Sequence, residues 1–453
     1  MFYDSWNCTK LLYSLYILFY NETDENIEYV KQTALDCGPV GQKLLQFFMM
    51  HDGFLSAESK KKFVYIFEEC ITHSWEETQK LYVEDFGRHI EEDFDINGLD
   101  IIPVGSGTLG QVYKLFHRKM KKHIALKVRH PNVERDAQRL ISTINFILNT
   151  AEWIKNIPFS ALIREFLNNI HVQLDYSLEA ENTKKIRNNF IQDNHIIIPK
   201  VYYFSPRCIA MSYHEGVPFT EIKDFQLRAK VSCDLLLFNV SSMLVYDLLH
   251  CDLHYGNWKV ILEPNNEYKL IIYDCGVIGT TGNEDANKLI CMTCMDGDYV
   301  KMYDILVPDM EKQRNGIRMR EYTQALMDKP YLKSSDRFAD FLKQMFLYKI
   351  KFNMEYLRCI QGVLTCLNVL VITTDKLTKI LGKKGNRLEI LVCYYHGLLK
   401  KMDKYPVLTK YLEIWMEEES MIEQVFYDWL EDTFGHRDKD VFVDAIIHRL
   451  LQL

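Results

Sequence analysis

The sequence predicts an α+β fold of two lobes, with a helical extension before the first lobe and a largely helical second lobe. Residues 1–97 carry apolar clusters at helical spacing between acidic stretches. Residues 99–128 change to short apolar runs around closely spaced glycines, which is typical of strands joined by tight turns. Beyond about residue 285 the pattern is helical again. We therefore expect three units, a helical extension over 1–97, a first lobe over 98–213 and a second lobe over 214–453 with added C-terminal helices.

Composition excludes several classes of function. The chain has 453 residues, of which 48% are hydrophobic and 26% charged, as in globular proteins. Its net charge of −8 argues against a nucleic-acid partner, because no basic excess is present to displace counterions from phosphates. Twelve cysteines in so long a chain indicate reduced thiols and an intracellular location. We expect neither a signal peptide nor a membrane-spanning helix, since the apolar run from Leu11 to Tyr20 is too short to span a bilayer.

The first motif is a glycine-rich loop with the pattern G-x-G-x-x-G-x-V. Glycines let backbone N–H groups approach phosphate oxygens, because no Cβ stands in the way. A dinucleotide-binding loop of the same spacing would need a helix to start at Gly110, whereas residues 111–115 alternate like a strand. The motif therefore indicates a loop that covers nucleotide phosphates, as in protein kinases. The residues assigned to it are Gly105, Ser106, Gly107, Thr108, Gly110 and Val112.

A lysine follows in the next expected strand, residues 124–128. Lys127 lies between apolar residues, where an ammonium is costly unless it is paired. The expected partner is Glu179, on a long helix predicted over residues 161–192 from apolar residues spaced by three and four. Such an ion pair would hold the ammonium toward the α- and β-phosphates of a nucleotide.

Two more strands are expected at residues 201–203 and 209–213. Glu215-Gly216-Val217-Pro218 then breaks the pattern, as a connection between two lobes would. We assign Met211 and Tyr213, directly before this break, to the nucleotide site.

The catalytic string follows a buried helix predicted over residues 226–250. Asp252 and Asn257 have four residues between them, as in the H-R-D-x-x-x-x-N string of protein kinases. A predicted hairpin then returns Asp274 to the side of Asn257. Asp252 can orient or deprotonate an attacking hydroxyl or water, while Asn257 and Asp274 offer oxygen ligands to Mg²⁺.

A metal-dependent hydrolase is the alternative interpretation of this string. His250, Asp252 and His254 could form a His-x-Asp-x-His ligand set, with Asp274 as a further ligand. This interpretation leaves the glycine-rich loop and Lys127 without a role.

Two polar residues interrupt an apolar run in the extension. Lys43 and Gln46 are three residues apart within the helix-like stretch 40–50, so they share one face. From the pattern alone they are the solvated side of an amphipathic helix.

Taken together, these strings resemble the UbiB family of atypical kinases, the aarF-domain kinases. The resemblance runs in order from about residue 36 to residue 280, and His250 to Asn257 is similar to the family's H-A-D-P-H-P-G-N. The other strings that carry it are Gly38-Pro39, Lys43-Leu44-Leu45-Gln46, residues 103–112, Ala125-Leu126-Lys127-Val128-Arg129-His130-Pro131-Asn132-Val133, Leu174-Asp175-Tyr176 and Glu179-Ala180.

The resemblance implies a protein-kinase-like fold with the extension packed over the site. It implies ATP and Mg²⁺ as cofactors, and ATPase or small-molecule kinase activity coupled to lipid or quinone-related metabolism at a membrane. The implied partners are a lipid-related or other small-molecule substrate and a membrane surface contacted peripherally. The alternative is a nucleotide-responsive scaffold without useful catalysis.

The resemblance also implies a role for each motif residue. Lys127 and Glu179 would form the ion pair and Asp252 would be the catalytic aspartate. Asn257 and Asp274 would be the Mg²⁺ ligands. Four residues would form the regulatory extension motifs K-x-G-Q and E-x-D, namely Lys43, Gln46, Gln173 and Asp175.

Three positions depart from the family pattern. Leu45 stands at the glycine of K-x-G-Q, and Gln173 replaces the first carboxylate of E-x-D. Gly105 and Gly107 stand in a nucleotide loop that is rich in alanine in the family. We expect from these departures a more loosely packed extension and a less inhibited site.

Overall fold

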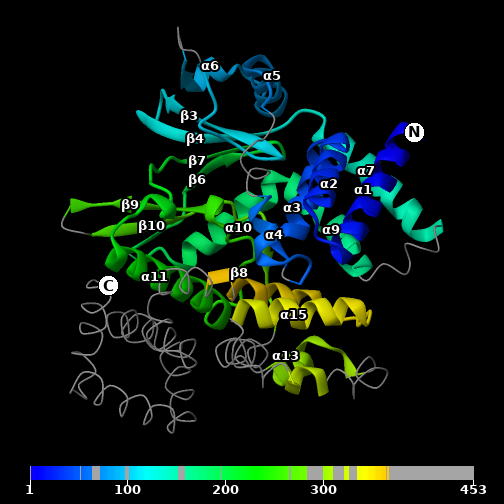
Figure 1. Cartoon of the computed structure of the whole chain (residues 1–453). Helices are drawn as coiled ribbons and strands as arrows, with labels where there is room; N and C mark the ends of the chain where they lie inside the picture. The colour runs from blue at the N-terminus through cyan, green and yellow to red at the C-terminus, as the bar shows by residue number, and fades with distance from the viewer. Residues whose placement is uncertain are drawn as a thin grey trace, which may run out of the picture.

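The computed structural model describes residues 2–51, 53–63, 72–96, 101–150, 159–193, 195–264, 267–282, 299–309, 321–325, 334–363 and 365–366. Within them a mainly antiparallel sheet forms one lobe and a largely helical lobe lies below it (Figure 1). The two-lobed α+β fold predicted from the sequence is confirmed. The added helices expected toward residue 453 lie outside the described residues. No helix in the described part of the chain is long and apolar enough to cross a membrane.

Four helices form the part of the extension that the structure describes before residue 64. Thr23 caps the second of them by accepting a hydrogen bond from Asn26 N (3.3 Å), and Pro39 lies in the first turn of the third, where its missing N–H is not needed. The first and third helices both pack against α7 (Val133–Thr150). The helices are α1 (Phe2–Tyr20), α2 (Asp24–Asp36), α3 (Gly38–Met50) and α4 (Ala57–Lys61).

An aromatic cluster joins the extension to the rest of the molecule. Phe19 of α1, Phe48 of α3, Phe54 and Phe159 are fully buried, with ring centroids 4.6–5.7 Å apart in tilted or edge-on arrangements. Such pairs stabilise by about 0.5–1.5 kcal/mol beyond their burial. Because Phe159 directly precedes the helix α9 (Ser160–Leu174), the core of the extension is continuous with the core of the kinase-like lobes.

The sheet of the first lobe has the order β1-β3-β4-β7-β6, and all pairs are antiparallel. β2 pairs with the same edge of β3 as β1 does, at the opposite end of that strand. One face of it packs against α5 (Trp75–Phe86), which begins with a capping box made by Ser74 and Glu77. The short helix α6 (Ile90–Asp93) leads into the first strand. The strands are β1 (Phe94–Asp95), β2 (Gly105–Ser106), β3 (Gly110–His117), β4 (Lys122–Arg129), β6 (Val201–Phe204) and β7 (Cys208–Ser212).

The single helix predicted over residues 161–192 is wrong, because the chain breaks at Asp175. Two helices form instead, α9 and α10 (Tyr176–Asn189). The Asp175 carboxylate accepts a hydrogen bond from Ser177 N (2.9 Å), while Tyr176 N donates to Pro206 O (3.0 Å). This cap turns α10 against β6 and β7, and it thereby carries Glu179 to the sheet.

The second lobe begins with α11 (Phe225–Leu244), which ends six residues before the predicted boundary at 250. Asp247 has a left-handed backbone (φ 44°), and residues 249–250 form a strand instead of a helical turn. The predicted hairpin is confirmed and also pairs with β5. The remaining elements are β5 (Ile196–Ile197), β8 (Leu249–His250), β9 (Trp258–Leu262), β10 (Tyr268–Ile272), β11 (Ile278–Gly279), α13 (Tyr299–Leu306) and α15 (Ser334–Leu347).

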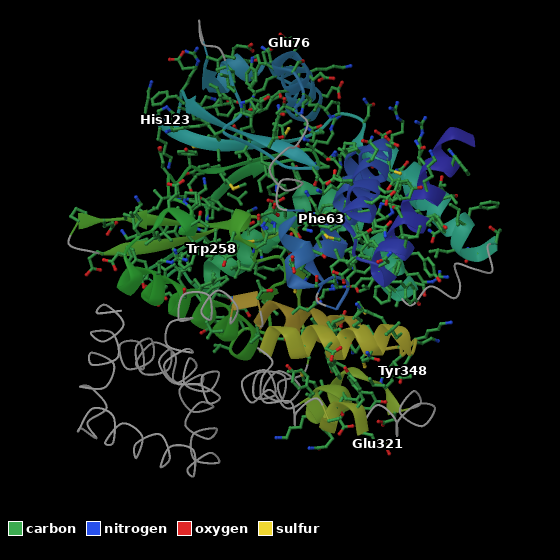
Figure 2. The ribbon with its side chains drawn as sticks, in the orientation of Figure 1. Phe63, Glu76, His123, Trp258, Glu321 and Tyr348 are labelled. Carbon is green, nitrogen blue, oxygen red and sulfur yellow. The ribbon has the colours of Figure 1, made fainter. Side chains whose placement is uncertain are left out.

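A buried tryptophan fixes the start of the hairpin. Trp258 is 1% exposed and packs against Phe219 and Tyr255, with ring centroids 5.2 and 5.7 Å away (Figure 2). Because Trp258 directly follows Asn257, this packing sets where the catalytic string ends.

Candidate active site

Lys127 lies at the centre of the site. Its Nζ donates to both carboxylate oxygens of Glu179 (2.9 and 2.7 Å) and to Asp274 Oδ2 (3.1 Å). The same ammonium lies 4.9 Å from the centroid of the Tyr176 ring. Helix α10, strand β4 and the segment after β10 therefore meet at this one cation.

The Lys127 ammonium contacts two carboxylates, those of Glu179 and Asp274, and the pKa values of these two groups shift in opposite directions. Burial raises the pKa of Glu179 to about 7, against the opposing effect of Lys127. Burial would also raise the pKa of Asp274, but Lys127 and Lys43 hold it well below its ordinary value. Burial lowers the pKa of Lys127, whereas Asp274 and Glu179 raise it further, so the result is well above its usual value. The Asp274 side chain is 41% exposed and that of Glu179 only 5%, so Asp274 is the charged carboxylate facing outward.

A buried histidine orients the catalytic string. His250 is fully buried, donates from Nε2 to Tyr273 O (2.9 Å) and accepts at Nδ1 from Asp252 N (3.2 Å). Burial lowers the pKa of His250, which agrees with the neutral tautomer that these bonds require. Both ring nitrogens bond to the backbone, so His250 is not a metal ligand as the hydrolase alternative requires. Among the described residues, no group of three or more histidine, cysteine or acidic side chains could hold a metal ion.

Asp252, Asn257 and Asp274 converge next to this histidine. Asn257 donates from Nδ2 to Asp252 O (2.8 Å), and Asn257 O accepts from Tyr273 N (2.7 Å). Asp274 adopts a left-handed backbone (φ 49°), and Gly276 N donates to its Oδ1 (3.3 Å). The predicted base and both predicted metal ligands are thus fixed to one another through the main chain.

The oxygen donors present fit a magnesium ion. Asn257 Nδ2 donates to Asp252 O, so the side-chain amide oxygen of Asn257 is the atom that can bind a cation. Asp274 is ionised and offers a charged carboxylate. Carboxylate and amide oxygens are ligands that Mg²⁺ prefers.

The extension reaches this site directly. Lys43 Nζ of α3 lies 3.9 Å from Asp252 Oδ2, and Thr108 Oγ1 of the loop donates to Gln46 Oε1 (3.4 Å). These contacts place α3 against the site, and the looser extension expected from the three departures stays a prediction. Leu45, which stands at the glycine of the family motif, is fully buried in the core.

The other two extension-motif residues lie elsewhere on the chain. Asp175 caps α10 with its carboxylate, as described above, and Gln173 is half-buried in the last turn of α9. Of the four residues assigned to the extension motifs, the structure brings Lys43 and Gln46 to Asp252 and the loop.

The predicted nucleotide residues share one face of the sheet. Val112 lies opposite Lys127 in the β3–β4 register, and Met211 lies opposite Ala125, two residues along β4. Residues directly opposite each other, or two apart on a strand, point to the same face. Tyr213 directly follows β7, and its ring lies 4.6 Å from Lys114 Nζ.

The glycine-rich loop itself is a tight hairpin. Gly105 pairs with Val112 and Ser106 with Gln111, and Gly107 N donates to Gly110 O (2.8 Å). A Cβ at Gly110 would collide with Tyr176 Oη and lie 2.6 Å from Val128 O, whereas one at Gly105 would meet nothing within 4 Å.

Gly110→Ala is therefore expected to lower the free energy of unfolding by roughly 1–3 kcal/mol, because a methyl group forces backbone and ring to shift. Gly105→Ala, as the matched control, is expected to stay within about 0.5 kcal/mol of the unmodified protein. Denaturant unfolding of both variants checks this, and equal stabilities would contradict the packing described for Gly110.

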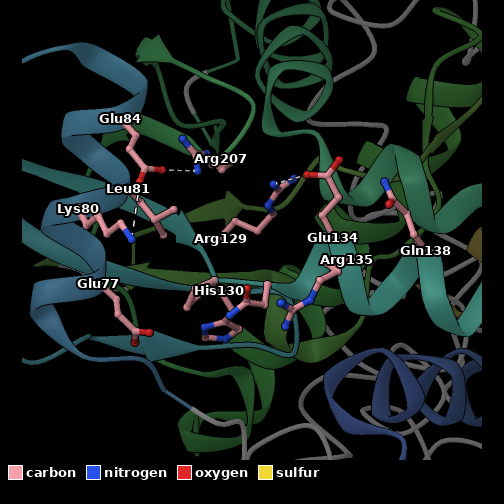
Figure 3. A pocket seen from close by; sticks show the side chains of 12 residues that line it. Glu77, Lys80, Leu81, Glu84, Arg129, His130, Glu134, Arg135, Gln138 and Arg207 are labelled. Atoms are coloured by element: carbon pink, nitrogen blue, oxygen red, sulfur yellow. Dashed lines mark hydrogen bonds and ion pairs between the residues drawn. The ribbon is translucent and has the colours of Figure 1, made fainter. Parts of the chain in front are cut away.

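A cavity of about 450 Å³ lies beside this hairpin, between α5 and α7 (Figure 3). Two ion pairs lie among the residues that line it, Arg207 with Glu84 (2.8 Å) and Arg129 with Glu134 (2.7 Å). None of the predicted nucleotide residues lines it, but His130 does. His130 belongs to a string noted for its family resemblance, and sequence reasoning gave it no role. Tyr176 was missed in the same way, although it directly follows Asp175.

The chain is similar to known proteins. Residues 65–306 match the family description "ABC1 atypical kinase-like domain". The chain is 26% identical over 285 residues to AarF domain-containing kinase 1 of Drosophila melanogaster, covering 57% of this chain and 54% of that one. It is 27% identical over 279 residues to a probable protein kinase UbiB of Shewanella sp. (strain ANA-3), covering 58% of this chain and 49% of that one. The chain spans about half the length of these two relatives. Among solved structures, the Rv3197–erythromycin complex from Mycobacterium tuberculosis is 15% identical with a TM-score of 0.44, covering 72% of this chain and 86% of that one.

Proposed function

Because this chain belongs to the family of ABC1 atypical kinase-like domains, we propose that it binds MgATP and transfers or hydrolyses its terminal phosphoryl group. One observation carries the proposal. Lys127 lies between Glu179 and Asp274, while Asp252 and Asn257 converge on the same place through bonds to the backbone. Charges arranged in this way suit a phosphoryl group, whose transfer depends on positioning and electrostatic stabilisation.

Each residue has a distinct task in the proposed reaction. The glycine-rich loop covers the phosphates, and Lys127 compensates their charge while Glu179 fixes the ammonium in place. Asp274 and Asn257 would hold Mg²⁺, which neutralises phosphate charge when bound. Asp252 accepts the proton of the attacking hydroxyl or water.

We propose a small, lipid- or quinone-related substrate, reached at a membrane that the protein contacts peripherally. The position of helix α3 favours a small molecule as the substrate rather than a loop of another protein. Lys43 of this helix covers Asp252 and leaves the Asp252 side chain only 15% exposed. The likeness to relatives named UbiB supports a lipid- or quinone-related substrate.

A second candidate is a nucleotide-responsive scaffold without catalysis. The contact between Lys43 and Asp252 favours it, because Lys43 covers the proposed base and stands where an attacking group would approach it. A scaffold would bind MgATP without turning it over. Phosphate release, measured with and without lipid vesicles, therefore separates the two candidates.

Thermal unfolding with MgATP tests the binding step. At about 100 times its Kd, MgATP should stabilise the folded protein by roughly 2.7 kcal/mol, which raises Tm by several degrees. ATP with excess chelator is the control and should give a much smaller shift. The absence of any shift at millimolar MgATP would refute the proposed function.

A further inference from the structure

We propose that His130, oriented by His73, is a positioning residue that holds the glycine-rich loop in its nucleotide-binding shape. The inference rests on the proposed function in one respect, namely that this loop receives the phosphates of MgATP. The hydrogen bonds described below are observed in the structure and do not depend on the proposed function.

His130 binds the loop at two carbonyl groups. Its backbone N donates to Leu109 O (2.9 Å), and its side-chain Nε2 donates to Gly107 O (2.9 Å). The residue is 8% exposed, so few water molecules compete for these bonds. On the opposite side of the loop, Gln46 of α3 accepts the hydrogen bond from Thr108. The loop is therefore held both from the extension and from the end of β4.

The contact with Gly107 fixes the tautomer of His130. A carbonyl oxygen only accepts, so Nε2 must carry the hydrogen, and in the neutral ring Nδ1 is then an acceptor. His73 Nδ1 lies 2.7 Å from His130 Nδ1 and donates to it. His73 Nε2 then accepts from Thr78 Oγ1 (2.9 Å), which in turn accepts from Tyr113 Oη (2.8 Å). One consistent order of donors thus runs from the sheet to the tip of the loop.

The ionisation of the two histidines agrees with this order. Burial and the neighbouring His130 lower the pKa of His73 to about 4. Burial also lowers the pKa of His130. Both rings are therefore neutral at neutral pH, as a single proton between the two Nδ1 atoms requires.

His73 is itself fixed to the strand that leaves the loop. Its backbone N donates to Gln111 Oε1 (3.0 Å), and Gln111 Nε2 donates to His73 O (3.0 Å). The Gln111 side chain is fully buried. The His73 backbone is therefore fixed by Gln111, and its ring is fixed separately by Thr78, so His73 supports His130 from a defined position.

A loop with three glycines needs such a support. Glycine has more backbone freedom than any other residue, so an unanchored loop would populate the binding shape only part of the time. Apparent affinity falls by the fraction of molecules that are competent. Loss of one buried hydrogen bond is therefore expected to weaken MgATP binding about 5–10-fold.

The decisive comparison is between His130→Gln and His130→Asn. Glutamine places its Nε2 as many bonds from Cβ as histidine Nε2, so it can still donate to Gly107 O. Asparagine is one bond shorter and reaches only toward His73. The two variants are alike in polarity and neutral, so a purely structural role of a polar side chain would affect both equally. His123→Gln on the exposed outer part of β4 (Figure 2) is the control.

Two measurements on the full-length protein are made for each variant. Hydrogen exchange of the loop amides without nucleotide should quicken roughly 5–10-fold in His130→Asn and stay near normal in His130→Gln. The Kd for MgATP should follow the same order, and His73→Leu should resemble His130→Asn.

Equal exchange and equal affinity in His130→Gln and His130→Asn would overturn the inference. If the unmodified protein binds no MgATP, the proposed function fails while the exchange comparison still decides the role of His130. If His130→Asn does not fold, the same comparison is made between His73→Leu and the His123→Gln control, and unchanged loop exchange there would also overturn it.

Discussion

Asp274→Asn is expected to abolish the Mg²⁺-dependent stabilisation by ATP while leaving the fold intact. Asparagine tolerates the left-handed backbone that Asp274 adopts (φ 49°), so no new strain arises. The change removes the charged ligand of the proposed magnesium site and leaves a neutral amide, which binds Mg²⁺ far more weakly. Thermal unfolding with and without MgATP measures the loss, and the expected shift is zero in place of several degrees.

Asp95→Asn is the matched control for this variant. The Asp95 side chain is 54% exposed and pairs with Arg118 at 3.1 Å, much as Asp274 pairs with Lys127 at the same distance. It lies on β1, away from the site, and should keep the full MgATP shift. A full shift in Asp274→Asn as well would show that the nucleotide binds somewhere else.

Asp252→Asn is expected to lower kcat about 10²–10⁴-fold, the usual contribution of a positioned general base. The amide can no longer accept a proton, but the backbone bonds of Asp252 to His250 and Asn257 remain. The Kd for MgATP should therefore stay within about threefold, because the proposed phosphate and metal contacts are untouched. Phosphate release at saturating MgATP gives kcat, and thermal titration gives Kd.

The Asp252→Asn variant also decides between the two candidate functions. An enzyme loses turnover and keeps binding, whereas a scaffold has no turnover to lose. Turnover that persists unchanged in Asp252→Asn would show that Asp252 is not the base. The Asp95→Asn protein serves again as the control for a lost surface carboxylate.

Local signals in the sequence predicted the parts of the site that depend on short segments. The glycine spacing predicted the loop. The alternation of residues 111–115 correctly predicted that a strand, and not a helix, follows it. The turn between residues 262 and 268 predicted the hairpin that returns Asp274 to Asn257. In each case the signal and the structure span fewer than about 20 residues.

The helix break at Asp175 shows where periodicity fails. An N-cap needs only one residue, so the apolar spacing of three and four continued almost unchanged across it. Asp175 acts as this N-cap, between the apolar residues of α9 and those of α10. Tertiary contact of Tyr176 N with Pro206 O, distant in sequence, settles the geometry.

Long-range pairs could not be predicted from the sequence. His73 and His130 are separated by 57 positions and carry no common motif, so nothing local indicates that their rings meet. The direction of Leu45 was equally hidden, because a motif position does not say whether a side chain faces the site or the core. The sequence therefore did not show that Gln46 of the extension contacts the glycine-rich loop.

The aromatic cluster described for Phe19, Phe48, Phe54 and Phe159 limits how far α3 can move. Exposing four buried phenylalanine side chains would cost roughly 6–12 kcal/mol, about as much as the entire stability of a typical domain. Partial unfolding that frees α3 is therefore about as rare as complete unfolding. Any movement of α3 that uncovers Asp252 is therefore expected to keep this cluster packed, as in a shear motion of one or two ångströms in scale.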